Sequence, residues 1–368
     1  MKIKIVLLYC LCMLLMACNG ENESNGMITM REGIEEKELI KWENHLKTEI
    51  SSLVIDQTNN EIIIAESQGG LFWVDLQTGE VNNYKKYDEK GFSYVYLRMN
   101  EDYIVAANQT CLFVIDRITN EIVYTNKYLK GNLQDVEVVN DSITVATKGY
   151  KITNISFKDF SVNWEFEEEY GSFRQDLEIH EDKVLFTGRY DKYIELNLKD
   201  GNVITKIESD MAFPFLVDDE MMYRIGNNKL HKYNLGKNSY EWIIGVSDNN
   251  IIRITNTGRF FVNDLTEKRL YEVNVKNGEK KMLFESYEHF LDEIVELEEG
   301  NLLIRNSDGT LKLFNEELKK ITWDYQSIDF GYNCKKILVN KDTVIIPEDD
   351  GLMQAIKIKE LIDRTRIE

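Results

Sequence analysis

A phrase that returns about every 40 residues constrains the fold of this chain more than any other feature of its sequence. The phrase consists of an apolar strand, an anchor residue (Asp or Asn, and Ser in one copy), a polar turn and a second strand. The anchors stand at positions 75, 116, 156, 197, 234, 274 and 315, so that successive copies are 37 to 41 residues apart. Self-similarity at a fixed period indicates a repeat architecture in which each copy forms one structural unit.

Each repeat is expected to hold four short strands. In the copy at 292–325, apolar and polar residues alternate over 293–297, 301–306, 310–314 and 320–325. The alternation, the β-branched and aromatic content, and turn signals such as Ser307-Asp308-Gly309 are typical of strands joined by hairpins. Four strands every ~40 residues predict the blades of an all-β propeller.

The two ends of the repeat region predict how the ring closes. The C-terminal segment supplies three strands, at 335–339, 342–346 and 352–356, and then a charged tail instead of a fourth. At the other end 38–42 forms a lone strand, and Trp42 stands 41 residues before Asn83, its counterpart in the first complete copy. We therefore expect one blade built from both ends, which leaves no open sheet edge. With seven complete copies this makes eight four-stranded blades over residues 38–368; a seven-bladed ring is the alternative.

The first 17 residues have the pattern of a signal peptide. Lys2 and Lys4 precede an apolar stretch, Ile5 to Met16, which is too short to cross a bilayer as a helix. It ends in Leu-Met-Ala-Cys, which resembles the lipobox of bacterial lipoproteins. The resemblance implies that Cys18 is acylated and becomes the N-terminus, so that lipid at Cys18 is the membrane anchor. Residues 18–37 are polar and acidic, as expected of a flexible tether.

The strong acidity of the chain restricts its partners. The formal net charge of −20 becomes −22 when Lys2 and Lys4 leave with the signal peptide. Such a surface repels nucleic-acid phosphates and anionic lipid headgroups. We therefore expect no nucleic acid among its partners and favour a basic protein. Cys111 and Cys334 lie far apart in the repeat scheme, which favours two separate thiols over a disulfide.

The repeated phrase resembles the tryptophan-docking repeat of quinoprotein-type propellers, Ala-x-Asp-x-x-Thr-Gly-x-x-x-Trp. Residues 73–79 carry its Asp and Thr-Gly parts, and Trp164, Trp242 and Trp323 carry its tryptophan. In that family the aromatic side chain packs against the next blade. The family includes quinone-dependent dehydrogenases and BamB-like envelope lipoproteins. The adjacent cysteine pair of the dehydrogenases is absent here, whereas length, lipobox and blade number match the lipoproteins. The acidity and the sparse glycines depart from those lipoproteins, so a shared partner does not follow.

The sequence contains none of the motifs that would indicate a known catalytic or metal site. The four histidines, His45, His180, His231 and His289, fall in four different repeats, and no H-E-x-x-H, G-x-S-x-G or phosphate-loop motif occurs. The acidic runs 165–169 and 348–351 could bind Ca²⁺, but neither has the spacing of an EF-hand. We therefore expect no enzyme activity, metal or cofactor. A carboxylate pair assembled from different blades stays open.

Binding is expected in the loops on one face, because in a propeller these gather residues from every blade. We expect the connections between the second and third strands to form this surface. The candidate partner-binding residues, most of them polar, are Gln68, Asn108, Tyr150, Arg189, Tyr190, Asn227, Asp308 and Asp349.

The sequence thus predicts a monomeric, lipid-anchored, non-catalytic binding or scaffold protein of the bacterial cell envelope, periplasmic or surface-exposed, that engages a protein partner. One alternative is a periplasmic immunity or inhibitor protein. Another is a propeller enzyme or a sugar-binding protein that uses the funnel face of the ring. Carboxylates gathered with aromatic residues around the pore would favour this last alternative.

Overall fold

The structure, a computed structural model, describes most of residues 39–365. The internal residues outside the description are 88–95, 109, 128–132, 140, 148–150, 168–176, 188–192, 208–214, 219–220, 227, 238, 248–249, 256, 286–290, 309, 318, 327–337, 341 and 349–350. The predicted signal peptide, the Cys18 lipid site and the predicted tether lie outside the described residues. Within the described part no helix is long and apolar enough to cross a membrane.

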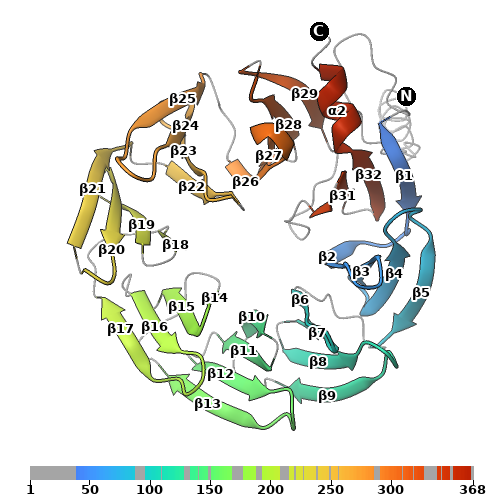
Figure 1. The fold of residues 1–368 in the computed structure, drawn as a ribbon. Helices are drawn as coiled ribbons and strands as arrows, with labels where there is room; N and C mark the ends of the chain where they lie inside the picture. Colours follow the sequence, from blue (N-terminus) through green and yellow to red (C-terminus); the bar gives the residue numbers. More distant parts are fainter. Residues whose placement is uncertain are drawn as a thin grey trace, which may run out of the picture.

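Eight four-stranded antiparallel sheets stand around a central axis as the blades of a propeller (Figure 1). In each blade we call the strands a to d, from the innermost to the outermost. Blade 1 contains β2 (Ile50–Asp56), β3 (Glu61–Glu66), β4 (Gly70–Asp75) and β5 (Val81–Lys86). Blade 2 contains β6 (Tyr96–Met99), β7 (Tyr103–Ala107), β8 (Cys111–Asp116) and β9 (Ile122–Lys127). Blade 3 contains β10 (Leu133–Val139), β11 (Ser142–Thr147), β12 (Lys151–Ser156) and β13 (Val162–Glu167).

Blades 4 to 7 repeat this order. Blade 4 contains β14 (Glu178–His180), β15 (Lys183–Thr187), β16 (Tyr193–Asn197) and β17 (Val203–Ile207). Blade 5 contains β18 (Phe215–Asp218), β19 (Met221–Gly226), β20 (Lys229–Asn234) and β21 (Ser239–Gly245). Blade 6 contains β22 (Asn250–Ile254), β23 (Phe260–Asp264), β24 (Arg269–Val273) and β25 (Lys280–Phe284). Blade 7 contains β26 (Leu291–Glu296), a 3-10 turn η3 (Glu298–Gly300), β27 (Leu302–Asn306), β28 (Thr310–Asn315) and β29 (Lys320–Gln326).

Blade 8 closes the ring with strands from both ends of the chain. It contains β30 (Leu338–Asn340), β31 (Thr343–Pro347), β32 (Leu352–Lys357) and, as its outermost strand, β1 (Ile40–His45). In the β1–β32 pair Trp42 lies opposite Ala355, and the register shifts by one residue between Ile40 and Trp42. Blade 1 has the same shift, between Val81 and Asn83. The predictions of eight blades, of a composite blade and of the equivalence of Trp42 and Asn83 are confirmed.

The C-terminal segment differs from the sequence prediction. Residues 358–365 were expected to belong to a charged tail, but they form the helix α2 (Ile358–Thr365). Ile358, Leu361 and Ile362 are buried in one cluster with residues of blades 7 and 8. The spacing of these three residues puts their side chains on one face of a helix, and this face has a core to cover.

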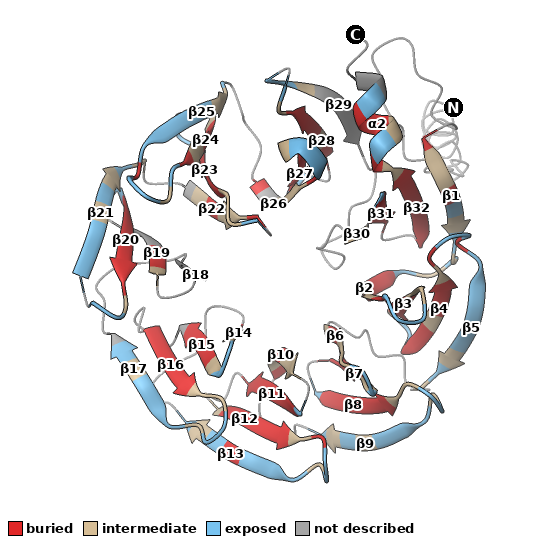
Figure 2. Ribbon diagram, in the orientation of Figure 1, coloured by how far each residue is buried: buried red, intermediate tan, exposed pale blue. Residues whose placement is uncertain are grey.

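The hydrophobic core lies between the blades. Strands b and c are buried on both faces, whereas the outermost strands d are largely exposed (Figure 2). For example, Ile62 to Ala65 of β3 are all 0% exposed. One cluster joins Ile63 and Trp73 of blade 1 to Leu97 and Ile104 of blade 2, and the other clusters likewise join neighbouring blades. A strand that packs against two neighbours carries continuous apolar runs, which explains why strand b of each repeat is so apolar.

The anchor residues build the turn between strands c and d. The side chain of Asp75 accepts hydrogen bonds from the backbone N–H groups of Gln77 (2.8 Å) and Thr78 (2.7 Å). Asp116 accepts the same two bonds within its own turn, and Asn197 and Asn274 each accept one. A side-chain oxygen that satisfies turn donors stabilises the turn locally, so an Asp or Asn at this position recurs with the blade.

Tryptophan side chains of strand d dock on the turn between strands c and d of the next blade, as the family resemblance implied. The indole N–H donates to the carbonyl one residue after the anchor: Trp42 to Leu76 (3.1 Å), Trp164 to Leu198 (2.8 Å) and Trp242 to Val275 (3.1 Å). Each ring lies on a glycine of that turn, namely Gly79, Gly201 and Gly278. The side chain of Trp323 lies outside the described residues.

Replacing Gly201 with alanine tests this docking. Gly201 has a φ of +71°, and an added Cβ would lie 2.6 Å from the ring of Trp164. Gly258 has a φ of +82° but no atom within 4 Å of an added Cβ, so it is the matched control. We expect Gly258→Ala to cost about 1–2 kcal/mol, from the positive φ alone. Gly201→Ala should cost roughly 1–3 kcal/mol more, because the ring must move. Equal losses in urea unfolding would contradict the docking geometry.

Candidate functional site

Three of the eight candidate binding residues are described. Gln68 and Asp308 are exposed in turns between strands b and c. Asn108 is 4% exposed, and its Oδ1 accepts hydrogen bonds from the N–H groups of Thr110 and Cys111 (both 2.8 Å), so its side chain holds its own turn. The other five, Tyr150, Arg189, Tyr190, Asn227 and Asp349, lie outside the described residues.

The residues most capable of catalysis or metal binding are dispersed. His45, His180 and His231 lie on β1, β14 and β20, which belong to different blades. Cys111 is buried. Over the described residues no group of three His, Cys, Asp or Glu side chains is placed to hold a metal ion. His289, Cys334 and parts of both acidic runs lie outside the description.

Two hollows among the described residues lie on the face where the tryptophans dock. We call it the docking face; it carries the a–b and c–d turns, whereas the b–c turns expected to bind a partner lie on the opposite face. The docking residue is not tryptophan in every blade: it is Asn83 in blade 1, Tyr124 in blade 2 and Met282 in blade 6. The residue that receives the docking side chain is a glycine where that side chain is one of the described tryptophans. For Asn83, Tyr124 and Met282 the receiving residues are Asn120, Phe160 and Lys319, and all three have a positive φ.

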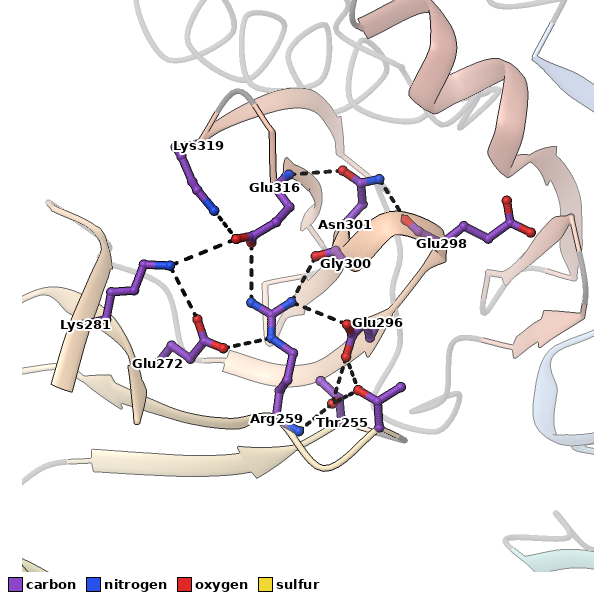
Figure 3. A network of polar contacts seen from close by, with 11 residues as sticks. Thr255, Arg259, Glu272, Lys281, Glu296, Glu298, Gly300, Asn301, Glu316 and Lys319 are labelled. Atoms are coloured by element: carbon purple, nitrogen blue, oxygen red, sulfur yellow. Dashed lines mark hydrogen bonds and ion pairs between the residues drawn. The ribbon is translucent and has the colours of Figure 1, made fainter. Parts of the chain in front are cut away.

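Where blades 6 and 7 meet, ionic contacts stand in place of a docked indole. Arg259 donates to Glu272 (2.8 Å) of its own blade and to Glu316 (3.3 Å) and the carbonyl of Gly300 (2.9 Å) of blade 7 (Figure 3). Its guanidinium also lies 3.5 Å from the Glu296 carboxylate. One arginine therefore joins three carboxylates across the interface, and bidentate donors of fixed geometry suit it to this role.

Lysines complete the neutralisation of this network. Lys319 pairs with Glu316, and Lys281 lies 3.9 Å from Glu272 and 4.0 Å from Glu316. Burial alone would raise the pKa of the Glu316 carboxyl, but the hydrogen bond from Lys319 and the positive charge of Arg259 lower it below its ordinary value. Burial alone would lower the pKa of Arg259, and the surrounding glutamates raise it instead. All three glutamates therefore have positively charged neighbours, as in an interface contact.

A cavity of about 530 Å³ adjoins the network in blade 6. Gly258, Arg259 and Phe260 of the a–b turn line one wall, and the c–d turn with Glu279 and Lys281 lines the other. In blades 1 to 4 and 8 a backbone hydrogen bond ties the a–b turn to the c–d turn, for example from the N–H of Leu198 to the carbonyl of Asp182 (2.7 Å). Blade 6 has a longer a–b turn, 255–259, and the cavity opens between its two turns.

A second ionic contact replaces the docked indole between blades 1 and 2. Arg117, one residue after the anchor, forms an ion pair with Asp56 of blade 1; their side chains are 7% and 2% exposed. Arg117 also donates to the carbonyl of Asn100 (2.7 Å), and Asp56 accepts from the N–H of Asn59 (3.0 Å). Blades 1 and 2 are thus joined by a buried ion pair.

Sequence reasoning missed both interfaces, although the sequence carries a signal for them. The residue after the anchor is apolar in most copies, namely Leu76, Phe157, Leu198, Leu235 and Val275. It is charged in two copies, as Arg117 and Glu316, and these are the two residues that form the ion pairs between blades.

Exposed carboxylates recur in the a–b turns, close to the axis of the ring. The residues are Glu101, Asp102, Asp141, Glu181, Asp182, Glu298, Glu299 and Asp342. They belong to blades 2, 3, 4, 7 and 8. Because strands a are the innermost, these turns bring acidic side chains from five blades to the inner part of the docking face (Figure 1).

Comparison with known proteins agrees with this architecture. The crystal structure of BamB from Moraxella catarrhalis superposes with a TM-score of 0.66 at 12% sequence identity, covering 90% of this chain and 100% of that one. The crystal structure of the computationally designed Ika8 protein superposes with a TM-score of 0.69 at 9% identity, covering 87% and 100%. At such identities the likeness shows the fold alone. No curated protein sequence matches the chain.

The family model described as outer membrane protein assembly factor BamB matches residues 90–281, which is more than half of the chain. These residues run from blade 2 into blade 6 and include the docking residues Trp164 and Trp242. The match agrees with the resemblance deduced from the repeated phrase. The chain belongs to the family of the outer membrane protein assembly factor BamB, as an eight-bladed β-propeller.

Proposed function

We propose that this protein is a lipid-anchored, non-catalytic scaffold of the bacterial cell envelope that binds a basic protein partner through its propeller loops. The observation that carries the proposal is the set of exposed carboxylates in the a–b turns of five blades. Membership of the BamB family supports the envelope location and the scaffold role.

The arrangement of these carboxylates suits recognition of a cationic surface. Charges of one sign gathered on one face create a potential that steers an oppositely charged partner and raises its association rate. Binding should therefore weaken as the salt concentration rises and screens the exposed charges. A scaffold needs no group poised for proton transfer, and the carboxylates of Glu272, Glu296 and Glu316 are shared by one arginine.

Capture of the partner from its own envelope tests the proposal. We expect the wild-type protein to retain a basic protein at low salt. Neutralising the pairs Glu101/Asp102, Glu181/Asp182 and Glu298/Glu299 to their amides should weaken this binding at least tenfold. The control is Glu165→Gln with Glu167→Gln on the exposed outer strand β13. If this control weakens binding equally, the docking face is not the binding surface. If only substitutions of Gln68 and Asp308 do so, the b–c turns bind the partner.

The alternatives have their own readouts. Protein purified from the envelope should contain no stoichiometric metal or quinone, and one such group per chain would favour a propeller enzyme. A captured partner whose toxic activity is neutralised on binding would favour an immunity protein.

The membrane anchor is tested at Cys18. Changing Cys18 to serine should move the protein from the membrane fraction to the soluble fraction, because the thioether that carries the lipid cannot form. Wild-type protein should incorporate labelled fatty acid and the variant should not. A wild-type protein without label, together with a variant that stays in the membrane, would contradict the lipoprotein assignment.

A further inference from the structure

A slot of about 90 Å³ opens on the docking face between blades 1 and 2. Its apolar wall consists of Ile63, Trp73 and Ile104, and its polar wall includes Arg117 and Asn120. The slot has a clear origin. Asn83 stands at the docking position of blade 1, where four other blades have a tryptophan, so no docked indole of strand d fills the space at this interface.

Two buried polar atoms of the slot have no hydrogen-bond partner among the described residues: the Nε of Arg117 and the Oδ1 of Asn120. The remaining guanidinium nitrogens of Arg117 are occupied by Asp56 and by the carbonyls of Asn100 and Glu101. The positive charge is therefore already neutralised by Asp56. What the slot offers is one free donor and one free acceptor, with the Glu61 carboxylate also in its lining.

We propose that this slot binds a carboxamide group, and that its natural occupant is an Asn or Gln side chain of the protein partner. The second part rests on the proposed function. A carboxamide has a carbonyl that accepts from the Nε–H of Arg117 and an N–H that donates to Asn120 Oδ1. Its carbon atoms can contact Trp73 and the two isoleucines. An unpaired buried donor or acceptor is costly, so a ligand that satisfies both is favoured.

An amide must displace water from the slot. A buried water molecule needs two to four polar partners. Besides the two unpaired buried atoms, the side chains of Asn59, Glu61 and Asn83 line the slot and can bond to water. A carboxamide with a short alkyl stem can pair with both unpaired buried atoms and contact the apolar wall, which water cannot do favourably.

The rim of the slot is suited to contact with a protein. Ile118, the residue after Arg117, is 91% exposed, more than any other large hydrophobic residue in the described part of the chain. It lies in the c–d turn of blade 2, next to the slot. An exposed isoleucine beside a polar slot gives a partner one apolar contact and one hydrogen-bonded side chain, the usual composition of a small contact centre.

Propionamide is the probe for the slot, used with the full mature chain carrying Cys18→Ser. We expect saturable shifts of the Trp73 indole and Arg117 Nε–H signals in NMR titrations, with a dissociation constant in the millimolar range, as expected for a ligand of five heavy atoms. Propionate, which is charged, and N,N-dimethylpropionamide, which has no N–H, should bind at least tenfold more weakly. Equal binding of all three compounds, or no saturable shift, would overturn the proposal.

A filled slot provides the matched variant. Asn83→Trp with Asn120→Gly recreates the indole-on-glycine arrangement of Trp164 and Gly201, so the fold should be kept and confirmed by an unchanged or raised Tm. This variant should lose propionamide binding, whereas Asn83→Ala, which widens the slot, should keep it. Undiminished binding in the filled variant would show that the probe binds elsewhere and would overturn the proposal. Crystals soaked with propionamide that contain only ordered water in the slot would overturn it too.

The partner assay separates this inference from the proposed function. If wild type captures a partner and the filled variant captures it at least tenfold more weakly, both are supported. If the filled variant captures it fully, the slot is not a partner site, while the proposed function stands. If wild type captures no protein at all, the proposed function and the natural occupant both fail, and the propionamide titration alone decides whether the slot binds amides.

Discussion

Replacing Trp42 with alanine is expected to lower the free energy of unfolding by about 3–5 kcal/mol, as is typical for a large buried aromatic. Trp42 is 7% exposed and is buried in one cluster with Ile62 of blade 1 and Met353 of blade 8. Its indole also donates to Leu76 of blade 1. The change therefore removes a large buried contact between the composite blade and its neighbour. Urea unfolding followed by circular dichroism measures the loss.

Met282→Ala is the matched control for this variant. Met282 occupies the same docking position in blade 6, but it is 44% exposed. Its truncation should cost under about 1 kcal/mol, because little apolar surface leaves water only in the folded state. A Trp42→Ala variant as stable as Met282→Ala would show that the docked indole does not hold the ring closed.

Deletions extend the same test to the whole N-terminal strand. Removing residues 38–46 takes away β1 and leaves β32 with an unpaired edge, so we expect a lower Tm and aggregation. Removing residues 19–30, in the predicted tether, should leave the melt unchanged. An unchanged melt after removal of 38–46 would contradict the closure seen in blade 8.

The fold could be predicted from the repeat because the spacing of apolar residues in each copy reflects which strands are buried. Two features of each repeat are local in sequence: the alternating or continuous apolar residues of a strand, and the anchor residue that builds a turn. Each blade repeats them at about the same spacing. Trp42 could be assigned to the outermost strand of the last blade since it stands one period before Asn83. The helix α2 was missed although Ile358, Leu361 and Ile362 carry a helical spacing, because three residues at the end of an all-β chain give a weak signal.

The contacts between blades were not predictable in the same way. The slot depends on Asn83 and Asn120, which are 37 residues apart and belong to different repeats. Likewise, Arg259 donates a hydrogen bond to Glu316 of the next blade, and no local sequence pattern indicates this contact. One rule could have been deduced from the sequence. Where the docking residue is Trp42, Trp164 or Trp242, a glycine stands four residues after the next anchor. Where the docking residue is Asn83, that position holds Asn120 instead. Applied to the sequence, this rule marks the junction of blades 1 and 2 as different.

Replacing Arg117 with methionine is expected to destabilise the protein by about 3–5 kcal/mol, as is typical when one partner of a buried ion pair is removed. The Asp56 side chain is 2% exposed and would be left buried without the guanidinium that pairs with it. Methionine preserves the length and much of the volume of the side chain, so the loss measures the ion pair more than the packing. Urea unfolding at neutral pH gives the value.

Arg259→Met is the control, because it removes an arginine of the same kind from a wetter site. The carboxylates around Arg259 are 14% to 24% exposed, and Lys281 and Lys319 stay beside two of them. Water and the lysines can therefore compensate, and we expect a loss of less than about 2 kcal/mol. Adding Asp56→Leu to Arg117→Met should restore much of the lost stability, since it removes the orphaned charge and leaves an apolar pair. If the double variant is no more stable than Arg117→Met alone, the orphaned carboxylate is not the cause of the loss, and the loss comes from the hydrogen bonds that Arg117 donates to the Asn100 and Glu101 carbonyls within blade 2.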